Sequence, residues 1–140
     1  MIAMADNRTG KYRLLRQIHG RGAFGEVHVQ VRASRSGDEP RVVWAVEGSD
    51  ETSAQPSHDP AETSAALEGA RLGLALVESL DRSVQSQTVL VTFVGINVAD
   101  TEPSAVRAAA SAAVVQAFGL EGMCRLVYEH GWHYVPNSHA

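Results

Sequence analysis

The sequence has little cysteine, no long apolar run and no excess of positive charge, and each absence excludes a class of protein. A single cysteine, Cys124, excludes an internal disulfide framework and is typical of a reducing, cytoplasmic location. No apolar run approaches the roughly 18 residues of a membrane span, and residues 1–10 have no apolar stretch of signal-peptide length. The net charge of −4 excludes an overall basic nucleic-acid binder. We therefore expect a cytoplasmic protein without a membrane partner.

The charge is unevenly distributed along the chain. Residues 1–21 carry five basic side chains against Asp6 alone, whereas residues 22–140 carry seven basic and fifteen acidic side chains. The five basic residues near the N-terminus are Arg8, Lys11, Arg13, Arg16 and Arg21. A basic end on an acidic body can contact phosphate groups locally. The alternative is a solvated basic strand, which is the more common meaning of a charge run.

Length and composition indicate one globular domain. The chain has 140 residues, of which 44% are hydrophobic, and this is enough to build a core without disulfides or metals. We expect a flexible lead-in at 1–10, a single domain over 11–136 and a short tail at 137–140. The acidic segment 48–58 is expected to be a loop, disordered in the absence of a partner.

Several segments have the residue pattern of strands. The expected strands cover residues 12–18, 26–33, 41–46, 88–94 and 126–128, the last extended by 132–135 past Gly131. Residues 26–33 alternate apolar and polar side chains, which is typical of a strand with one buried face. Residues 41–46 are expected to be its hairpin partner. Residues 88–94 are apolar on both faces, which indicates a central strand.

Two segments have the pattern of helices. Asp59 can cap a helix that Pro60 begins, and apolar side chains then recur at helical spacing as far as residue 80. A second, alanine-rich helix is expected from about 103 to 118, with Asp100 and Glu102 near its start as capping residues. These elements predict an α+β fold, a two-layer sandwich in which a mixed four-stranded sheet carries two helices on one face.

The most conspicuous motif is a glycine string at residues 20–27 (GRGAFGEV), which matches the protein-kinase pattern G-x-G-x-x-G-x-V. A kinase also needs a lysine in the following strand, where this chain has Glu47, and it needs H-R-D and D-F-G motifs that are missing here. The dinucleotide fingerprint fails as well, because it must open a helix and these glycines open a strand. No G-x-x-x-x-G-K-[ST] motif is present, so no nucleotide or other cofactor is expected.

The order of motifs over residues 10–135 resembles domain IV of elongation factor G. Residues 16–27 (RQIHGRGAFGEV) are similar to the R-Q-x-G-G-R-G-x-Y-G-x-V segment that opens that domain. The expected first helix, through residues 66–72 (ALEGARL), is similar to the family's I-P-x-x-x-x-x-A-V-x-x-G-[IL] helix. Residues 92–110 follow the order of its next strand, loop and alanine-rich helix. This order is more specific than any one of the motifs.

The resemblance implies a fold shared with domain 2 of ribosomal protein S5, and two tip loops that enter the ribosomal decoding region. On this mapping the loops are residues 19–25 and 95–100. The candidate RNA or ribosome contacts are His19, Gly20, Arg21, Gly22, Gly95, Asn97 and Asp100. Glycine lets the backbone approach RNA phosphates, and Arg21 supplies a charge-assisted contact. The chain departs from the family pattern at His19, where the family has glycine, and it lacks a histidine in the second loop.

Other candidate sites have simpler explanations. His130, His133 and Cys124 could be drawn as metal ligands, but odd offsets along a strand point to opposite faces, so no metal site is expected. Cys124 has no activating neighbour in the sequence, and Trp44 and Trp132 are expected to be packing residues rather than a base-stacking platform. We therefore predict a stand-alone, non-enzymatic, translation-linked module without GTPase activity of its own, which contacts the ribosome or structured RNA. The alternative is a protein-interaction or regulatory domain that reuses the fold.

Overall fold

Alternating apolar side chains build the first two strands. In the computed structural model, which describes residues 7–18, 20–84, 86–97 and 100–137, strands β1 (Arg8–Ile18) and β2 (Arg21–Ala33) form a long antiparallel hairpin. Val27, Val29 and Val31 are buried on one face of β2, as the alternation predicts. Residues 8–10 belong to β1, although the sequence analysis assigned them to the lead-in.

The apolar strand β4 (Gln87–Gly95) lies inside the sheet, as predicted. It pairs antiparallel with β2 on one side and parallel with the short strand β3 (Val42–Trp44) on the other, which gives the order β1-β2-β4-β3. The sheet is therefore mixed and four-stranded, as expected. The expectation that residues 41–46 pair with 26–33 is wrong, because β4 occupies that place and leaves β3 at the edge.

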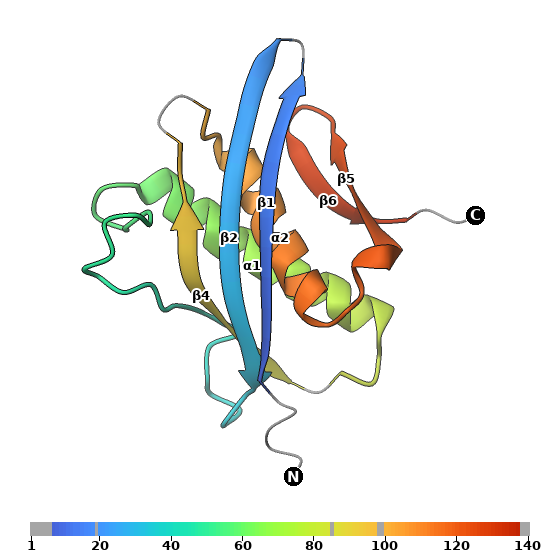
Figure 1. The fold of residues 1–140 in the computed structure, drawn as a ribbon. Helices are drawn as coiled ribbons and strands as arrows, with labels where there is room; N and C mark the ends of the chain where they lie inside the picture. Colours follow the sequence, from blue (N-terminus) through green and yellow to red (C-terminus); the bar gives the residue numbers. More distant parts are fainter. Residues whose placement is uncertain (1–6, 19, 85, 98–99, 138–140) are drawn as a thin grey trace.

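Both helices cover the same face of this sheet. Figure 1 shows α1 (Pro60–Leu80) and α2 (Pro103–Ala117) behind the strands, which confirms the two-layer α+β sandwich. Neither helix has the side-chain cap that the sequence suggested. The Asp59 carboxylate instead accepts the backbone N–H of Gln55 at 3.1 Å, and the Glu102 carboxylate accepts the Ser104 hydroxyl. None of the helices in the described part of the chain is long and apolar enough to cross a membrane.

Small residues bring α2 close to its neighbours. Ten of its fifteen residues are buried, most of them alanine. A methyl group on Gly10 of β1 would lie 2.0 Å from the carbonyl oxygen of Ala113, and one on Gly69 of α1 would lie 2.1 Å from that of Arg107. Each glycine is therefore needed where another backbone crosses its Cα. The helix lies in the middle of the fold, with a strand on one side and α1 on the other.

The last part of the chain forms a second, separate sheet. After a short 3-10 turn (Glu121–Met123), β5 (Cys124–Tyr128) and β6 (Trp132–Pro136) pair antiparallel. The expectation of one extended strand is wrong, because His130 with φ 56° and Gly131 with φ 130° reverse the chain. Figure 1 shows this hairpin beside β1 and α2, where Tyr12 and Tyr134 pack with ring centroids 6.2 Å apart.

The acidic connection between β3 and α1 is held against the sheet, contrary to the expectation of disorder. Ala54 is fully buried, and its N–H donates to the Val94 carbonyl at 2.7 Å. The Ser53 hydroxyl accepts the Val94 N–H at 3.0 Å. The Gln55 amide donates to the carbonyls of Glu47 and Asp50, so the loop also closes on itself.

Candidate functional site

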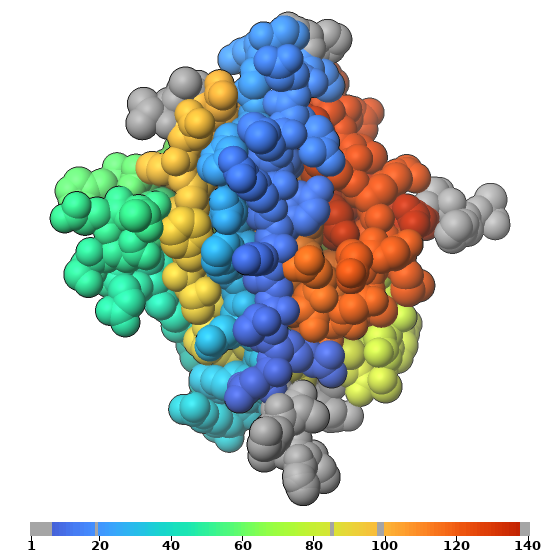
Figure 2. All heavy atoms as spheres, in the orientation of Figure 1, coloured from blue at the N-terminus to red at the C-terminus, as the bar shows by residue number. Residues whose placement is uncertain are grey.

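The tip of the β1–β2 hairpin and the segment after β4 lie at the same end of the sheet. The β2–β4 ladder starts at Glu26 and Gly95, so the part of β2 before residue 26 extends beyond it. The segment after β4 bends back against this overhang, where the Phe24 N–H donates to the Asp100 carbonyl at 3.0 Å. Figure 2 shows the hairpin tip projecting past the rest of the molecule. The sequence placed both segments in one contact surface, and the structure brings them side by side.

Most of the first expected loop is strand. Residues 21–25 belong to β2, and the turn itself is confined to the residues around Gly20, which has φ +77°. His19 lies outside the described residues. A methyl group on Gly22 would lie 2.9–3.0 Å from the Asp100 carboxyl group, and one on Gly25 would lie 2.8 Å from the backbone of α2 at Ala105 and Val106. The fold therefore uses these glycines for its own packing.

The second expected loop begins later than predicted. Gly95 is a buried end residue of β4 rather than a loop residue. The Asn97 carbonyl accepts the N–H of Asp100 at 3.1 Å and that of Thr101 at 2.8 Å, which closes a tight turn. Of the six described candidate residues, Arg21 and Gly22 therefore lie beside Asp100, whereas Gly95 lies inside the sheet.

The hairpin carries a row of exposed cations. Every basic side chain of residues 7–25 is exposed, and this segment contains no acidic residue. The five are Arg8, Lys11, Arg13, Arg16 and Arg21. Two of them lie over aromatic rings, Arg13 over Phe24 at 5.5 Å and Arg8 over Phe118 at 4.8 Å. Within the described part of the chain, no hydrogen bond or ion pair engages the Arg21 side chain.

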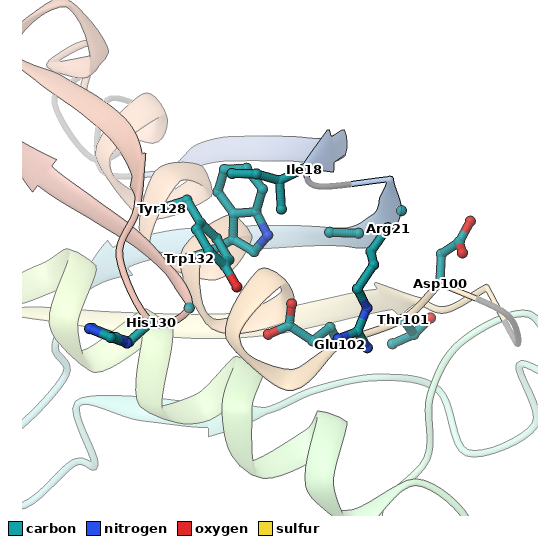
Figure 3. Close-up of a pocket in the computed structure, with 11 residues that line it drawn as sticks. Ile18, Arg21, Asp100, Thr101, Glu102, Tyr128, His130 and Trp132 are labelled. Atoms are coloured by element: carbon teal, nitrogen blue, oxygen red, sulfur yellow. The ribbon is translucent and has the colours of Figure 1, made fainter.

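A groove of about 290 Å³ opens between the hairpin tip and the β5–β6 turn. Figure 3 shows side chains reaching it from three segments: Ile18 and Arg21 from the hairpin, Asp100 to Glu102 from the segment before α2, and Tyr128 and Trp132 from the second sheet. Tyr128 and Trp132 pack edge to face with centroids 5.1 Å apart. His130 also lines the groove, but its ring points away from Arg21 (Figure 3).

The backbone of Trp132 is held on both sides by side chains of α2. Its backbone N–H donates to the Ser104 hydroxyl oxygen at 2.9 Å, and its carbonyl accepts from Arg107 at 3.1 Å. Its side chain is 6% exposed, yet the indole Nε1–H has no hydrogen-bond partner among the described residues. Figure 3 shows the nitrogen-bearing edge of the indole facing the space between Ile18 and Glu102.

Sequence reasoning favoured packing over base stacking for Trp132, and helix capping over acid–base chemistry for Glu102. The indole is packed into the core, but it also lines the groove. The missed signal is the Gly131 turn. Had residues 129–131 been interpreted as a hairpin loop, Tyr128 and Trp132 would have been paired across it, as they are in the structure.

The histidines and the cysteine considered as metal ligands are placed separately. Cys124 is buried at the start of β5, and this burial raises the pKa of its thiol. The His133 ring is within 3.1 Å of the Glu129 carbonyl oxygen. Among the residues that the structure describes, no three His, Cys, Asp or Glu side chains come together as a metal site would require.

Comparison with known proteins shows a related fold. No family model matches the chain, and no curated protein matches it. The fold is similar to part of a crystal structure of a protein from Thermus thermophilus, with a TM-score of 0.57 and 14% sequence identity. The similarity covers 93% of this chain and 23% of that one, so this chain spans about a quarter of the length of the protein it resembles.

Proposed function

We propose that this chain is a non-catalytic, translation-linked module that contacts the ribosome or structured RNA through the overhanging end of its hairpin. The order of sequence motifs, which resembles domain IV of elongation factor G, supports this proposal. The similarity of the fold to one part of a longer protein is compatible with it. The proposed contact residues are Arg21 and Gly22, with Asn97 and Asp100 beside them.

The observation that carries the proposal is the row of exposed cations on the hairpin, none of which forms an ion pair within 4 Å in the described part of the chain. Five basic side chains in a segment, residues 7–25, that itself contains no acidic residue create a local positive field on a protein of net charge −4. Phosphate groups are bound through such fields and through charge-assisted hydrogen bonds from arginine. Figures 1 and 2 show the hairpin tip as the part that protrudes furthest at its end of the molecule, so it can reach a phosphate backbone without steric hindrance from the acidic body.

The second candidate is a protein-interaction domain. Outside residues 7–25 the chain carries seven basic and sixteen acidic residues, a net charge of −9. A surface of this sign repels nucleic acid over most of its area and favours a basic protein partner. In this case the hairpin would be a solvated basic strand.

Ribosome co-sedimentation at low and moderate salt separates the two. We expect the chain to pellet with ribosomes at low salt and to be released as salt rises. Each phosphate that the protein neutralises makes the slope of the logarithm of the association constant against the logarithm of the salt concentration more negative by about 0.7–0.9. Arg21→Ala should weaken binding and flatten this slope. Arg82→Ala, which removes an exposed arginine from the turn after α1, is the matched control and should bind like the wild type. Absence from the pellet at low salt would favour the protein-interaction candidate.

A further inference from the structure

The face of the sheet opposite the helices is open along β1, β2 and β4. Val27, Val29 and Val31 of β2 are buried in the core under the helices. Because strand side chains alternate, His28 and Gln30 lie on the opposite, open face. Figures 1 and 2 show the sheet from that side, and no described helix passes in front of these strands. Some RNA-binding domains use such a face of a four-stranded sheet to stack unpaired bases on aromatic side chains.

Two aromatic rings lie side by side on the open face. His28 and Phe93 are partners across the β2–β4 ladder, and their ring centroids are 4.7 Å apart. The His28 Nε2 atom is 2.8 Å from a Glu26 carboxylate oxygen, which fixes the imidazole beside its neighbour. A methyl group on Gly95 would lie 3.1 Å from Cε2 of Phe93, so this ring leans along β4 over the glycine. Phe93 is partly exposed and already held in place, which lowers the entropy cost of binding to it.

Exposed cations lie in the same rows of the sheet. Lys11 is opposite His28 in the β1–β2 ladder, so Lys11, His28 and Phe93 form one row across three strands. Two strand spacings of ~4.8 Å place Lys11 roughly 10 Å from Phe93. Arg13, opposite Glu26, is the next residue of β1 on this face, and both cations are exposed. The Glu26 carboxylate is engaged by His28, so the row favours an anionic ligand that also has a flat apolar part.

A hollow of about 460 Å³ adjoins the two rings. Lys11, His28 and Gln30 are among the residues that line it. Its volume is within the ~300–1,000 Å³ of small-molecule sites, which is enough for one nucleotide. A glutamine side chain both donates and accepts hydrogen bonds, so Gln30 does not restrict the occupant to one base.

We infer that this open face binds single-stranded RNA, with one base stacked on Phe93 and the phosphate backbone along Lys11 and Arg13. The inference rests on the proposed RNA contact and gives it a second surface, which is continuous with the tip because the same hairpin carries both. Stacking tolerates any base, since every base has a π-face. Duplex RNA keeps its bases stacked on one another, so the face should prefer single strands.

The test compares two labelled single strands by fluorescence anisotropy with the full chain. One is an oligouridine of about 10 nucleotides, and the other is an abasic strand of the same length. Both carry the same phosphates, so any difference in affinity reports the bases alone. We expect the wild type to bind the oligouridine roughly 5-fold to 150-fold more tightly, the equivalent of one stacked base. Equal affinities for the two strands would overturn the inference.

A matched pair of variants locates the stacking site. Phe93→Leu keeps an apolar side chain over Gly95 but removes the ring, so oligouridine should bind only as well as the abasic strand. Phe118→Leu makes the same change at a ring that lies under Arg8 at the end of α2, and it should keep the wild-type preference. A preference that survives in Phe93→Leu would contradict the inference, provided that this variant unfolds like the wild type.

Two further variants separate the ring from the charge. Phe93→Tyr keeps an aromatic ring and should keep the preference for oligouridine. Lys11→Ala should weaken the binding of both strands alike and make the salt slope less negative by about 0.7, because a phosphate contact is lost without a change in stacking. A preference lost in Lys11→Ala but retained in Phe93→Leu would assign base recognition to the wrong residue and overturn the inference.

The two proposals fail in different ways. If the chain pellets with ribosomes in a salt-dependent manner but binds oligouridine and the abasic strand equally, the inference is wrong and the proposed function stands. If Phe93 is required for oligouridine binding but ribosomes and structured RNA are not bound, the open face is a single-strand site and the proposed function is wrong.

Discussion

Arg21 and Arg32 lie at opposite ends of the same strand, and their surroundings differ completely. Arg32 donates to both carboxylate oxygens of Glu39, at 2.9 and 2.5 Å, and the two side chains are 17% exposed. Glu39 also accepts the Arg35 N–H at 2.7 Å and the Thr88 hydroxyl at 3.2 Å. These bonds close the connection between β2 and β3. Arg21 is exposed and has no such partner among the described residues.

This difference separates an arginine that the fold requires from one that it does not. A bidentate guanidinium–carboxylate pair fixes the geometry of a loop, and removing one partner leaves the other without its charge. An exposed arginine without a partner contributes little to folding, and its charge remains available to a ligand. The end of the sheet that carries Arg32 is therefore a structural junction, whereas the end that carries Arg21 is the candidate binding surface.

The largest of these effects on the free energy of unfolding is expected at Gly25, which lies at the same end of β2 as Arg21. Gly25→Ala would place a methyl group 2.8 Å from the backbone of α2, which cannot move aside as a side chain does. We expect a loss of roughly 1–3 kcal/mol or more in the free energy of unfolding, measured by urea denaturation. Gly37→Ala, in the connection near Arg32, meets open space and is the matched control, with an effect within about 0.5 kcal/mol. Equal losses in both variants would show that α2 does not approach Gly25.

The next effect compares the two arginines directly. Arg32→Ala should lower the urea midpoint clearly, because Glu39 would lose both of its guanidinium hydrogen bonds. Arg21→Ala should change the free energy of unfolding by no more than about 0.5 kcal/mol, since its exposed side chain forms no hydrogen bond or ion pair with the described residues. A larger loss for Arg21→Ala than for Arg32→Ala would reverse the comparison and remove the reason for regarding Arg21 as available for binding.

The junction at Arg32 should also make stability depend on pH. The hydrogen bonds from Arg32, then that from Arg35, lower the pKa of Glu39 from 4.5 to about 2. A carboxyl group with a lowered pKa stabilises the fold fully above its unfolded value and loses that contribution as it becomes protonated. The loss should therefore occur between pH 4.5 and pH 2. Urea midpoints measured across this range should fall more steeply for the wild type than for Glu39→Gln, and parallel curves would contradict the pairing.

Much of the fold could be predicted because helices and buried strands leave periodic patterns. The expected helices, 60–80 and 103–118, match Pro60–Leu80 and Pro103–Ala117 almost residue for residue. Strand β4 was expected to be central because both of its faces are apolar. The partner of β3 could not be predicted in the same way. Alternation indicates which face of a strand is buried, but it does not indicate which strand lies beside it.

The position of the hairpin tip in the candidate site could be predicted from the glycine string, but the role of its glycines and the place of Trp132 could not. The glycine string located the hairpin tip, and Arg21 is exposed there. The reason that glycine is needed at these positions is contact between segments distant in sequence, such as that of Gly25 with Ala105. No local sequence pattern contains that information. Trp132 was overlooked as a groove residue because its place depends on the turn at His130, a non-glycine residue with φ 56°. Positive φ is uncommon for a non-glycine residue, so the only sequence signal for this turn was Gly131.

The smallest expected effect on stability is that of Gly22, which follows Arg21 in the sequence. A methyl group there would lie 2.9 Å from the carboxyl carbon of Asp100, the far end of a side chain that can rotate away. Replacing glycine by alanine within a strand also gains about 0.5–1 kcal/mol through lower backbone entropy in the unfolded chain, which offsets the cost of moving Asp100. We therefore expect Gly22→Ala to unfold within about 0.5 kcal/mol of the wild type. The Asp100 backbone amide signal should still shift, because the carboxylate has moved. A loss as large as that of Gly25→Ala would show that Asp100 is held rigidly, and the tip would then be a second structural junction.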